Sequence, residues 1–179
     1  SKYSPLNDSV LVEIAKKLGQ CQFVFFNFDE NLTSILKERL QLTFANAGID
    51  AHQFLRFIPF LKKEEFHGLM QKADLYLDTI GFSGFNTAMQ AIACDLPVLT
   101  IEGTKMRGRL ASAILNRIGL ESLVCQSNSA YIDLAVELIQ NRELLASYQD
   151  KIAQSKTILF NDLEPIKALE DFLIQQTRK

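Results

Sequence analysis

The segment 78–87 contains the residues of this sequence that are best suited to bind a charged ligand. It runs from the end of an apolar stretch, through two glycines, to a helical pattern that begins at Asn86. Free N–H groups and the helix dipole at such a start attract anions, and a phosphate is favoured over a carboxylate if cations lie nearby. Side chains that could add hydrogen bonds to a phosphate are those of Ser83, Asn86 and Thr87.

A purely structural interpretation of this segment is also open. Its glycines would then serve the turn, and Asn86 or Thr87 would only cap the following helix. The spacing matches neither G-x-G-x-x-G nor a Walker loop, so it predicts no dinucleotide or P-loop site. Gln90 lies one helical turn beyond Asn86 and is either a ribose ligand or an ordinary exposed residue.

Two other loops could contribute to the same site. The loop 59–66 offers peptide groups to a base edge and a charge at Lys63, although its two lysines and two glutamates are more typical of a solvated helix start. The loop 101–109 places two glycines among three cations that include Arg107 and Arg109. Because arginines at a helix start oppose the helix dipole, we favour phosphate binding over a simple helix start for this loop.

The remaining reactive side chains give weaker signals. Asp74 and Asp78 are four residues apart and form either an acid–base pair or, as we favour, an element end and a residue that orders the glycine turn. The three cysteines and two histidines lack ligand spacing, which predicts no metal site and no cysteine nucleophile. Cysteines among apolar neighbours are typical of reduced thiols in a cytoplasmic protein. These residues are Cys21, Cys94, Cys125, His52 and His67.

The elements that must position the three loops alternate between strand and helix. Short apolar runs predict strands at 22–28, 55–59, 74–79, 97–101 and 122–125. Helical patterns between them form right-handed βαβ units, which predicts an α/β fold with a doubly wound, Rossmann-like parallel sheet. In such a sheet ligands bind beyond the carboxyl ends of the strands, where these loops lie. A helical carboxyl-terminal tail is predicted at 129–140, 142–157 and 163–176.

The chain begins with a helical pattern rather than with a strand. Ser4 and Pro5 are suited to the N-cap and first turn, and Gly19 to the end of this helix. The apolar stripes of the first two helices comprise Leu6, Val10, Leu11, Ile14 and Leu18, and Leu32, Ile35, Leu36, Leu40 and Phe44. Since a doubly wound sheet usually starts with a strand, we expect that the sheet lacks one or that the chain belongs to a longer protein. An unprotected slot is then expected beside the strands 22–28 and 74–79.

Length and composition fit a single domain over residues 1–179 and exclude several function classes. The chain is 47% apolar and 22% charged, as in ordinary globular domains. Its 19 Lys and Arg against 21 Asp and Glu give a net charge of −2, so no basic field indicates nucleic acid as a partner. No apolar run approaches the ~20 residues of a membrane helix, and no secretory signal is visible.

Several segments occur in an order that resembles one known family. They are Pro59–Phe66, Ala73–Thr79, Ser83–Thr87, Leu96–Thr100, Gly103 with Arg109, Gly119-Leu120 and Phe160–Asp162. Together they are similar to the carboxyl-terminal half of protein O-linked N-acetylglucosamine transferases, particularly the bacterial SPINDLY-like branch. The resemblance covers almost the whole chain. It implies a GT-B enzyme, in which two Rossmann-like halves hold a UDP-sugar and this half binds the nucleotide.

The resemblance also implies roles for single residues. Lys2 would contact the diphosphate and act as the catalytic residue that stabilises the leaving UDP. The other implied UDP-sugar ligands are Leu61 (through its backbone) and Lys63 at the nucleoside, Gly84, Phe85, Asn86 and Thr87 at the helix start, Gln90 at the ribose, and Arg107 and Arg109 as supporting cations. No metal and no cofactor is implied, because the UDP-sugar is a substrate.

Some positions depart from the family pattern. The family often has histidine at the positions of Phe66 and Phe85, a second threonine at that of Asn86 and an acid at that of Gln90. An arginine that meets uracil in the animal enzymes aligns with Leu69.

The resemblance leads us to expect half of an inverting glycosyltransferase that transfers N-acetylglucosamine or a related hexose to protein Ser or Thr hydroxyls. Its implied partners are the UDP-sugar, a protein acceptor and the amino-terminal half of the enzyme. Two alternatives stay open, a GT-B transferase that acts on a glycan or small molecule, and a module that binds a nucleotide or protein without turnover.

Overall fold

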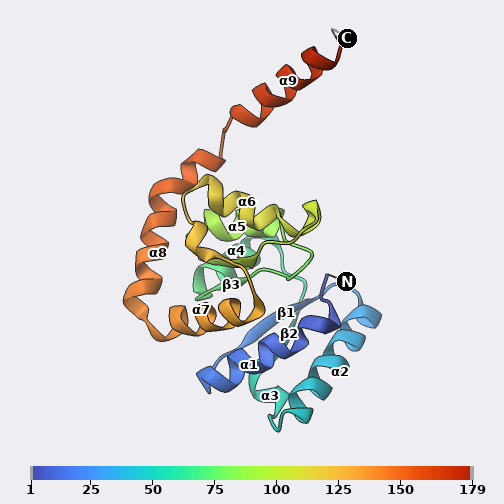
Figure 1. The fold of residues 1–179 in the computed structure, drawn as a ribbon. Coiled ribbons are helices and arrows are strands. Elements are labelled where there is room, and N and C mark those ends of the chain that lie inside the picture. Colours follow the sequence, from blue (N-terminus) through green and yellow to red (C-terminus); the bar gives the residue numbers. More distant parts are fainter. Residues whose placement is uncertain (1, 178–179) are drawn as a thin grey trace.

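The computed structural model describes residues 2–177, and strands alternate with helices in it (Figure 1). The strands are β1 (Phe23–Asn27), β2 (Leu55–Pro59), β3 (Tyr76–Leu77), β4 (Val98–Ile101) and β5 (Val124–Cys125). The helices around them are α1 (Asp8–Leu18), α2 (Glu30–Asn46), α3 (Ala51–Phe54), α4 (Lys63–Lys72), α5 (Asn86–Ala93) and α6 (Leu110–Arg117). The helices α7 (Asn128–Gln140), α8 (Arg142–Ser155) and α9 (Glu164–Thr177) follow β5 and form the predicted helical tail.

All strand pairs in the described residues are parallel, which confirms the predicted sheet type. The strand order is β1–β2 in one sheet and β3–β4–β5 in a second sheet, so the expected single sheet is divided between β1 and β3. The third strand is shorter than predicted. The backbone hydrogen bonds between β3 and β4 nevertheless continue beyond the bounds of these strands. Tyr76 N–H donates to Pro97 O at 2.8 Å, and Asp78 N–H donates to Leu99 O at 2.9 Å.

Strand β4 shows why the fold counts as doubly wound. Its neighbouring residues Val98 and Leu99 point to opposite faces, and each is almost fully buried, at 1% and 0% exposure. Leu99 packs in an apolar cluster with α1, α2, β1 and α7. Val98 packs in a second cluster with α5, α6 and α8. Both faces of the sheet are therefore covered by helices, as the continuous apolar strands predicted.

The first helix ends at the predicted residue, but α1 begins only at Asp8, because the predicted cap Ser4 starts a 3₁₀ turn instead of the α-helix. Ser4 Oγ accepts a hydrogen bond from Leu6 N–H at 3.4 Å, and Gly19, with φ +70°, ends α1. Leu6 is 87% exposed because it lies in the 3₁₀ turn η1 (Pro5–Asn7) and not on the buried face of α1.

The apolar stripe of α2 is buried only in its second half. Leu36, Leu40 and Phe44 belong to the core, whereas Leu32 and Ile35 are exposed at 50% and 58%. The elements that cover α2 therefore leave its first turns open to solvent.

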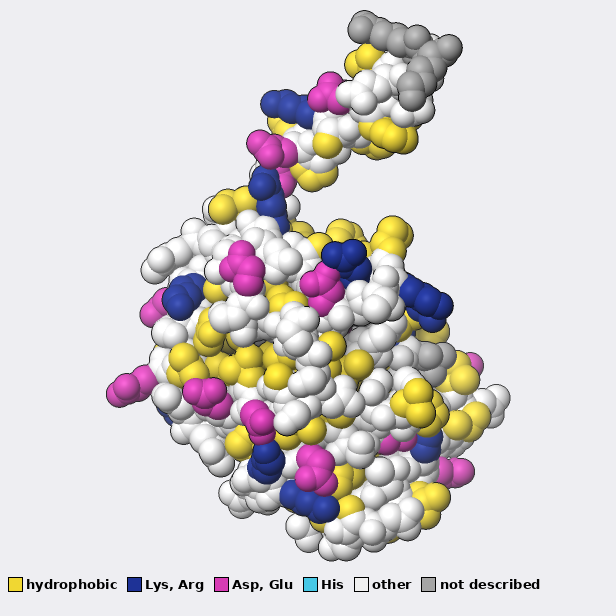
Figure 2. Space-filling view, viewed as in Figure 1, with side chains coloured by type: hydrophobic (Ala, Val, Ile, Leu, Met, Phe, Trp, Pro, Cys, Tyr) yellow, Lys and Arg dark blue, Asp and Glu magenta, His cyan; other side chains and the backbone are white. Residues whose placement is uncertain are grey.

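The helix α9 projects away from the body of the protein (Figure 1). It has no buried residue within its described length, and apolar side chains are exposed along it (Figure 2). They include Ile166, Leu169, Phe172, Leu173 and Ile174. Within residues 2–177, no helix combines the length and the apolar character that a membrane crossing requires.

Candidate functional site

Asp78, at the carboxyl end of β3, holds the glycine turn in place. Its side chain is buried, and Oδ1 accepts a hydrogen bond from Gly84 N–H at 2.7 Å. Oδ2 accepts from Ser83 Oγ at 2.6 Å and from Thr100 Oγ1 at 2.7 Å. A buried carboxylate requires such donors, so the shape of the turn is tied to this residue. The interpretation of Asp78 as an ordering residue is confirmed, since Asp74 instead pairs with Arg142 at the surface, at 2.5 Å.

The loop after β4 packs directly onto this turn. Ser83 N–H donates to Arg107 O at 2.8 Å, and Ser83 Oγ accepts from Ala111 N–H at 2.8 Å. Within the second loop, Gly103 N–H donates to Gly108 O at 2.8 Å. A Cβ on Gly103 would lie 3.1 Å from Gly108 Cα, so the two backbones need glycine to approach this closely. The loops after β3 and β4 are therefore joined by hydrogen bonds and close backbone contact.

The start of α5 has no side-chain cap. Phe85 is the N-cap residue and forms no capping hydrogen bond, while Asn86 is exposed. Thr87 Oγ1 lies 2.7 Å from the hydroxyl of Tyr76. Burial raises the pKa of Tyr76 to about 12, so this hydroxyl keeps its proton at neutral pH. Neither Asn86 nor Thr87 caps the helix, which removes the structural interpretation in which they only do so.

Two cations that are far apart in the sequence lie against the same aromatic ring in the turn before this helix. Lys2 Nζ lies 4.9 Å from the centre of the Phe82 ring and 3.4 Å from Ser83 O, to which it donates. The guanidinium carbon of Arg107 lies 5.8 Å from the same ring. Arg109 differs, because it pairs with Glu102 at 2.6 Å. Among the described residues, Lys2 and Arg107 supply the positive charge next to the glycine turn.

The loop after β2 forms a separate part of the same edge. Leu61 is half-buried and Lys63 is exposed at the start of α4. Glu65 accepts a hydrogen bond from Lys62 N–H at 2.9 Å, so one of the two glutamates caps this helix. The rings of Phe28 and Phe60, which follow β1 and β2, meet edge to face with centres 5.8 Å apart and are 84% and 70% exposed.

The structure thus brings together part of the residues singled out from the sequence. The start of α5 and the turn before it bring together Lys2, Gly84, Phe85, Asn86, Thr87 and Arg107. Gln90 is half-buried one turn further along this helix. Arg109 is directed to Glu102, and Leu61 and Lys63 lie on the loop after β2. The sequence analysis missed Phe82 and Tyr76. Residue spacing does not reveal a ring that two cations contact, as at Phe82, or a strand hydroxyl that meets a helix start, as at Tyr76.

The thiols and histidines offer no activated nucleophile. Burial raises the pKa of Cys21 and of Cys125 to about 11, which keeps both protonated at neutral pH. The fold brings Cys94 Sγ within 3.8 Å of His67 Nδ1, a pairing that spacing did not predict, but burial raises the pKa of this thiol too. In residues 2–177, His, Cys, Asp and Glu side chains form no group of three that could hold a metal ion.

A surface hollow of about 610 Å³ lies away from these loops. Residues of α1, α7 and α8 line it, including Lys17 and Asp133, which pair at 2.5 Å. Neither glycine-bearing loop contributes to its lining, so we do not include it in the candidate site.

Comparison with known proteins assigns the family. A family model described as glycosyl transferase family 41 matches residues 5–166. The chain belongs to glycosyl transferase family 41. The resemblance to the carboxyl-terminal half of a GT-B O-linked N-acetylglucosamine transferase is thereby confirmed, and so is the class of glycosyltransferase.

Two curated relatives show which proteins the family 41 chain is similar to. It is 26% identical to a UDP-N-acetylglucosamine–peptide N-acetylglucosaminyltransferase of Caenorhabditis elegans over 145 residues, which are 80% of this chain and 12% of the relative. It is 28% identical over 86 residues to a probable enzyme of the same description, SPINDLY, of Oryza sativa subsp. japonica, and these residues are 46% of this chain and 9% of the relative. The chain therefore spans only a small part of these curated relatives.

A solved structure agrees with the family 41 fold. The O-GlcNAc transferase of Thermobaculum terrenum, in a mutant form, superposes with a TM-score of 0.83 at 24% identity. The match covers 96% of this chain and 33% of the bacterial one. It shows that the arrangement of strands and helices is that of one third of the bacterial chain.

Proposed function

We propose that the carboxyl edge of the two sheets binds the nucleotide of a UDP-sugar, with the diphosphate at the start of α5. The observation that carries this proposal is that Lys2 and Arg107 both lie against the ring of Phe82, beside an uncapped helix. A helix start with two added cations favours a phosphate over a carboxylate. The aromatic pair Phe28–Phe60 and the backbone around Leu61 offer a place for the base at the same edge.

In the full-length protein, we propose, this site takes part in transfer of N-acetylglucosamine or a related hexose to a Ser or Thr hydroxyl of a protein. The bond between the sugar and the diphosphate breaks in that step, and negative charge grows on the leaving UDP. Lys2, Arg107 and the dipole of α5 would stabilise this charge without a metal ion. The described residues give no obvious catalytic base, so we assign the acceptor side to the amino-terminal half of the enzyme.

Calorimetry on the full-length protein tests the nucleotide site. We expect UDP to bind about tenfold more tightly than GDP or ADP, because the loop around Leu61 would contact the smaller pyrimidine through its backbone. Addition of EDTA should leave the affinity unchanged. Equal affinities for the three nucleotides, or loss of binding with EDTA, would contradict the proposed site.

The two arginines of the loop after β4 provide a matched pair of variants. Arg107→Gln should weaken UDP binding by about three- to tenfold, because it removes a charge that faces the glycine turn. Arg109→Gln should have a much smaller effect, since the charge of Arg109 is already paired with Glu102. Titrations of both variants with UDP measure the difference, and a larger loss for Arg109→Gln would reverse our assignment of the cations.

Three further statements stay predictions of the sequence. We propose a cytoplasmic location, supported by three cysteines that are all free in the structure. We also propose a bacterial source, and a single nucleotide-sugar-binding domain over residues 1–179.

A further inference from the structure

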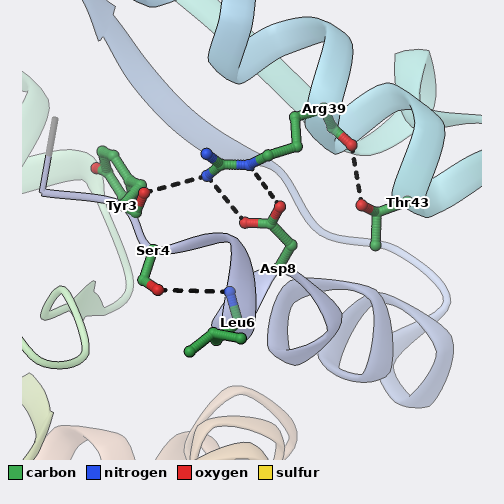
Figure 3. A network of polar contacts seen from close by, with 6 residues as sticks. All are labelled: Tyr3, Ser4, Leu6, Asp8, Arg39 and Thr43. Carbon is green, nitrogen blue, oxygen red and sulfur yellow. Dashed lines mark hydrogen bonds and ion pairs between the residues drawn. The ribbon is translucent and has the colours of Figure 1, made fainter.

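The segment that carries Lys2 is held by an arginine from a distant helix (Figure 3). Arg39, on α2, donates from Nε to Asp8 Oδ2 at 2.6 Å and from Nη2 to Asp8 Oδ1 at 3.1 Å. The same Nη2 donates to the backbone carbonyl of Tyr3 at 3.2 Å. Asp8 is buried, at 7% exposure, so the two-point contact fixes the plane of the guanidinium.

The side chain of Tyr3 is fixed as well, on the opposite side of its backbone. Its ring meets the ring of Phe25 on β1 edge to face, with centres 5.3 Å apart. Its hydroxyl is hydrogen-bonded to Thr79 in the segment after β3, and burial of this hydroxyl raises its pKa. Tyr3 therefore joins the two sheets where they are not paired to each other, and its carbonyl and its hydroxyl are both held.

Lys2 lies one residue before this anchored position. A free lysine side chain samples many rotamers, so an ammonium group is useful to a transition state only if its backbone is fixed. Here the fixed backbone lets Nζ reach Ser83 O at 3.4 Å and the face of Phe82 at 4.9 Å. If Arg39 served only to connect α1 with α2, its ion pair with Asp8 would be sufficient. The third hydrogen bond, to Tyr3, links this ion pair to Lys2.

We propose that Arg39, oriented by Asp8, is a positioning residue that acts through the Tyr3 backbone to present the Lys2 ammonium group to the diphosphate. This inference rests on the proposed function. It adds a residue, Arg39, that does not contact the UDP-sugar.

The kinetic test uses the full-length protein. Arg39→Met should lower the turnover number by about tenfold to a hundredfold and change the KM for the UDP-sugar by less than about threefold, because only Lys2 is displaced and the other donor contacts are kept. Arg39→Lys should keep an ion pair with Asp8 but not recover the turnover, since a single ammonium cannot serve Asp8 and Tyr3 with the same geometry.

Arg117→Met is the matched control. Arg117 is also an arginine with more than one partner, since it pairs with Asp162 at 2.9 Å and with Glu164 at 3.6 Å, and it lies on α6. Its replacement should leave turnover unchanged. A variant Arg39→Met with normal turnover would overturn the inference, and so would full recovery of turnover by Arg39→Lys.

A double variant separates positioning from general damage. If Arg39 acts through Lys2, then Lys2→Gln with Arg39→Met should turn over no more slowly than Lys2→Gln alone. If Arg39 only supports the fold, the two losses should multiply, and the inference would be wrong.

A measurement on this chain keeps the inference testable even if sugar transfer is absent. Lysines dimethylated with ¹³C retain their charge, and the Lys2 signal should be displaced by the ring current of Phe82 in the NMR spectrum. Lys2→Gln identifies that signal by its loss. Arg39→Met should return the signal to the position of exposed lysines, and Arg117→Met should not. A Lys2 signal unaffected by Arg39→Met would overturn the inference, whereas a folded wild type that neither binds UDP nor transfers sugar would overturn the proposed function instead.

Discussion

Replacing Lys2 with glutamine in the full-length protein should lower the turnover number by about 10²- to 10³-fold, the usual loss when one stabilising donor is removed from a transition state. The KM for the UDP-sugar should change far less. The reason is that negative charge on the diphosphate grows as the sugar leaves, so a positioned ammonium group contributes more to the transition state than to the bound substrate. Steady-state kinetics with a peptide acceptor measure both quantities.

Lys16→Gln is a suitable control for this experiment. Lys16 is an exposed lysine of α1 that pairs with Glu13 at 3.3 Å, and its loss should leave both constants unchanged. If Lys2→Gln retains full turnover, the leaving-group cation is a different residue, and Arg107 is the next candidate because it faces the same ring.

Replacing Asp78 with alanine should lower the free energy of unfolding by about 3 kcal/mol or more. The change leaves Thr100 Oγ1 and Gly84 N–H without the acceptor that each now has at 2.7 Å. It also leaves Ser83 Oγ with only its longer contact, to Gly84 O at 3.3 Å, in place of the one at 2.6 Å. Each buried polar group that loses its partner costs about 1–3 kcal/mol. Urea unfolding of the chain, followed by circular dichroism, measures the difference.

Two variants bracket this result. Asp78→Asn should cost less than Asp78→Ala, because the amide oxygen can still accept from Gly84 N–H while the two hydroxyls rotate. Asp74→Ala should cost under about 1 kcal/mol, since Asp74 is exposed and its pair with Arg142 lies at the surface. Similar losses for Asp74→Ala and Asp78→Ala would show that the buried network does not hold the turn.

The glycine turn was predictable because its signals are local. Two glycines between a strand end and a helix start are consecutive in the chain, and their conformational freedom belongs to the residues themselves. The role of Asp78 followed from its place at the end of the strand. Its third partner, Thr100, did not, because β4 reaches it only through parallel pairing.

The errors in the helices have one physical cause. Helical periodicity shows which side chains share a face, but not how much of that face a neighbour covers. Periodicity places Leu6 on a buried stripe, but the chain makes a 3₁₀ turn there. Leu32 and Ile35 lie on turns of α2 that are exposed. Burial depends on which elements pack together, so each of these residues required the folded structure.

The sequence by itself determined the alternation of strands and helices, the parallel sheet type, the position of the glycine turn and the resemblance to the transferase family. All four depend on residues that are close in the chain or on their order along it. Only the tertiary structure decided that Lys2 and Arg107 face one ring while Arg109 is paired with Glu102. It also decided that Arg39 holds the Tyr3 carbonyl and that the sheet divides between β1 and β3. Contacts between residues far apart in the chain depend on how the elements pack together, and a local pattern of residue types does not predict them.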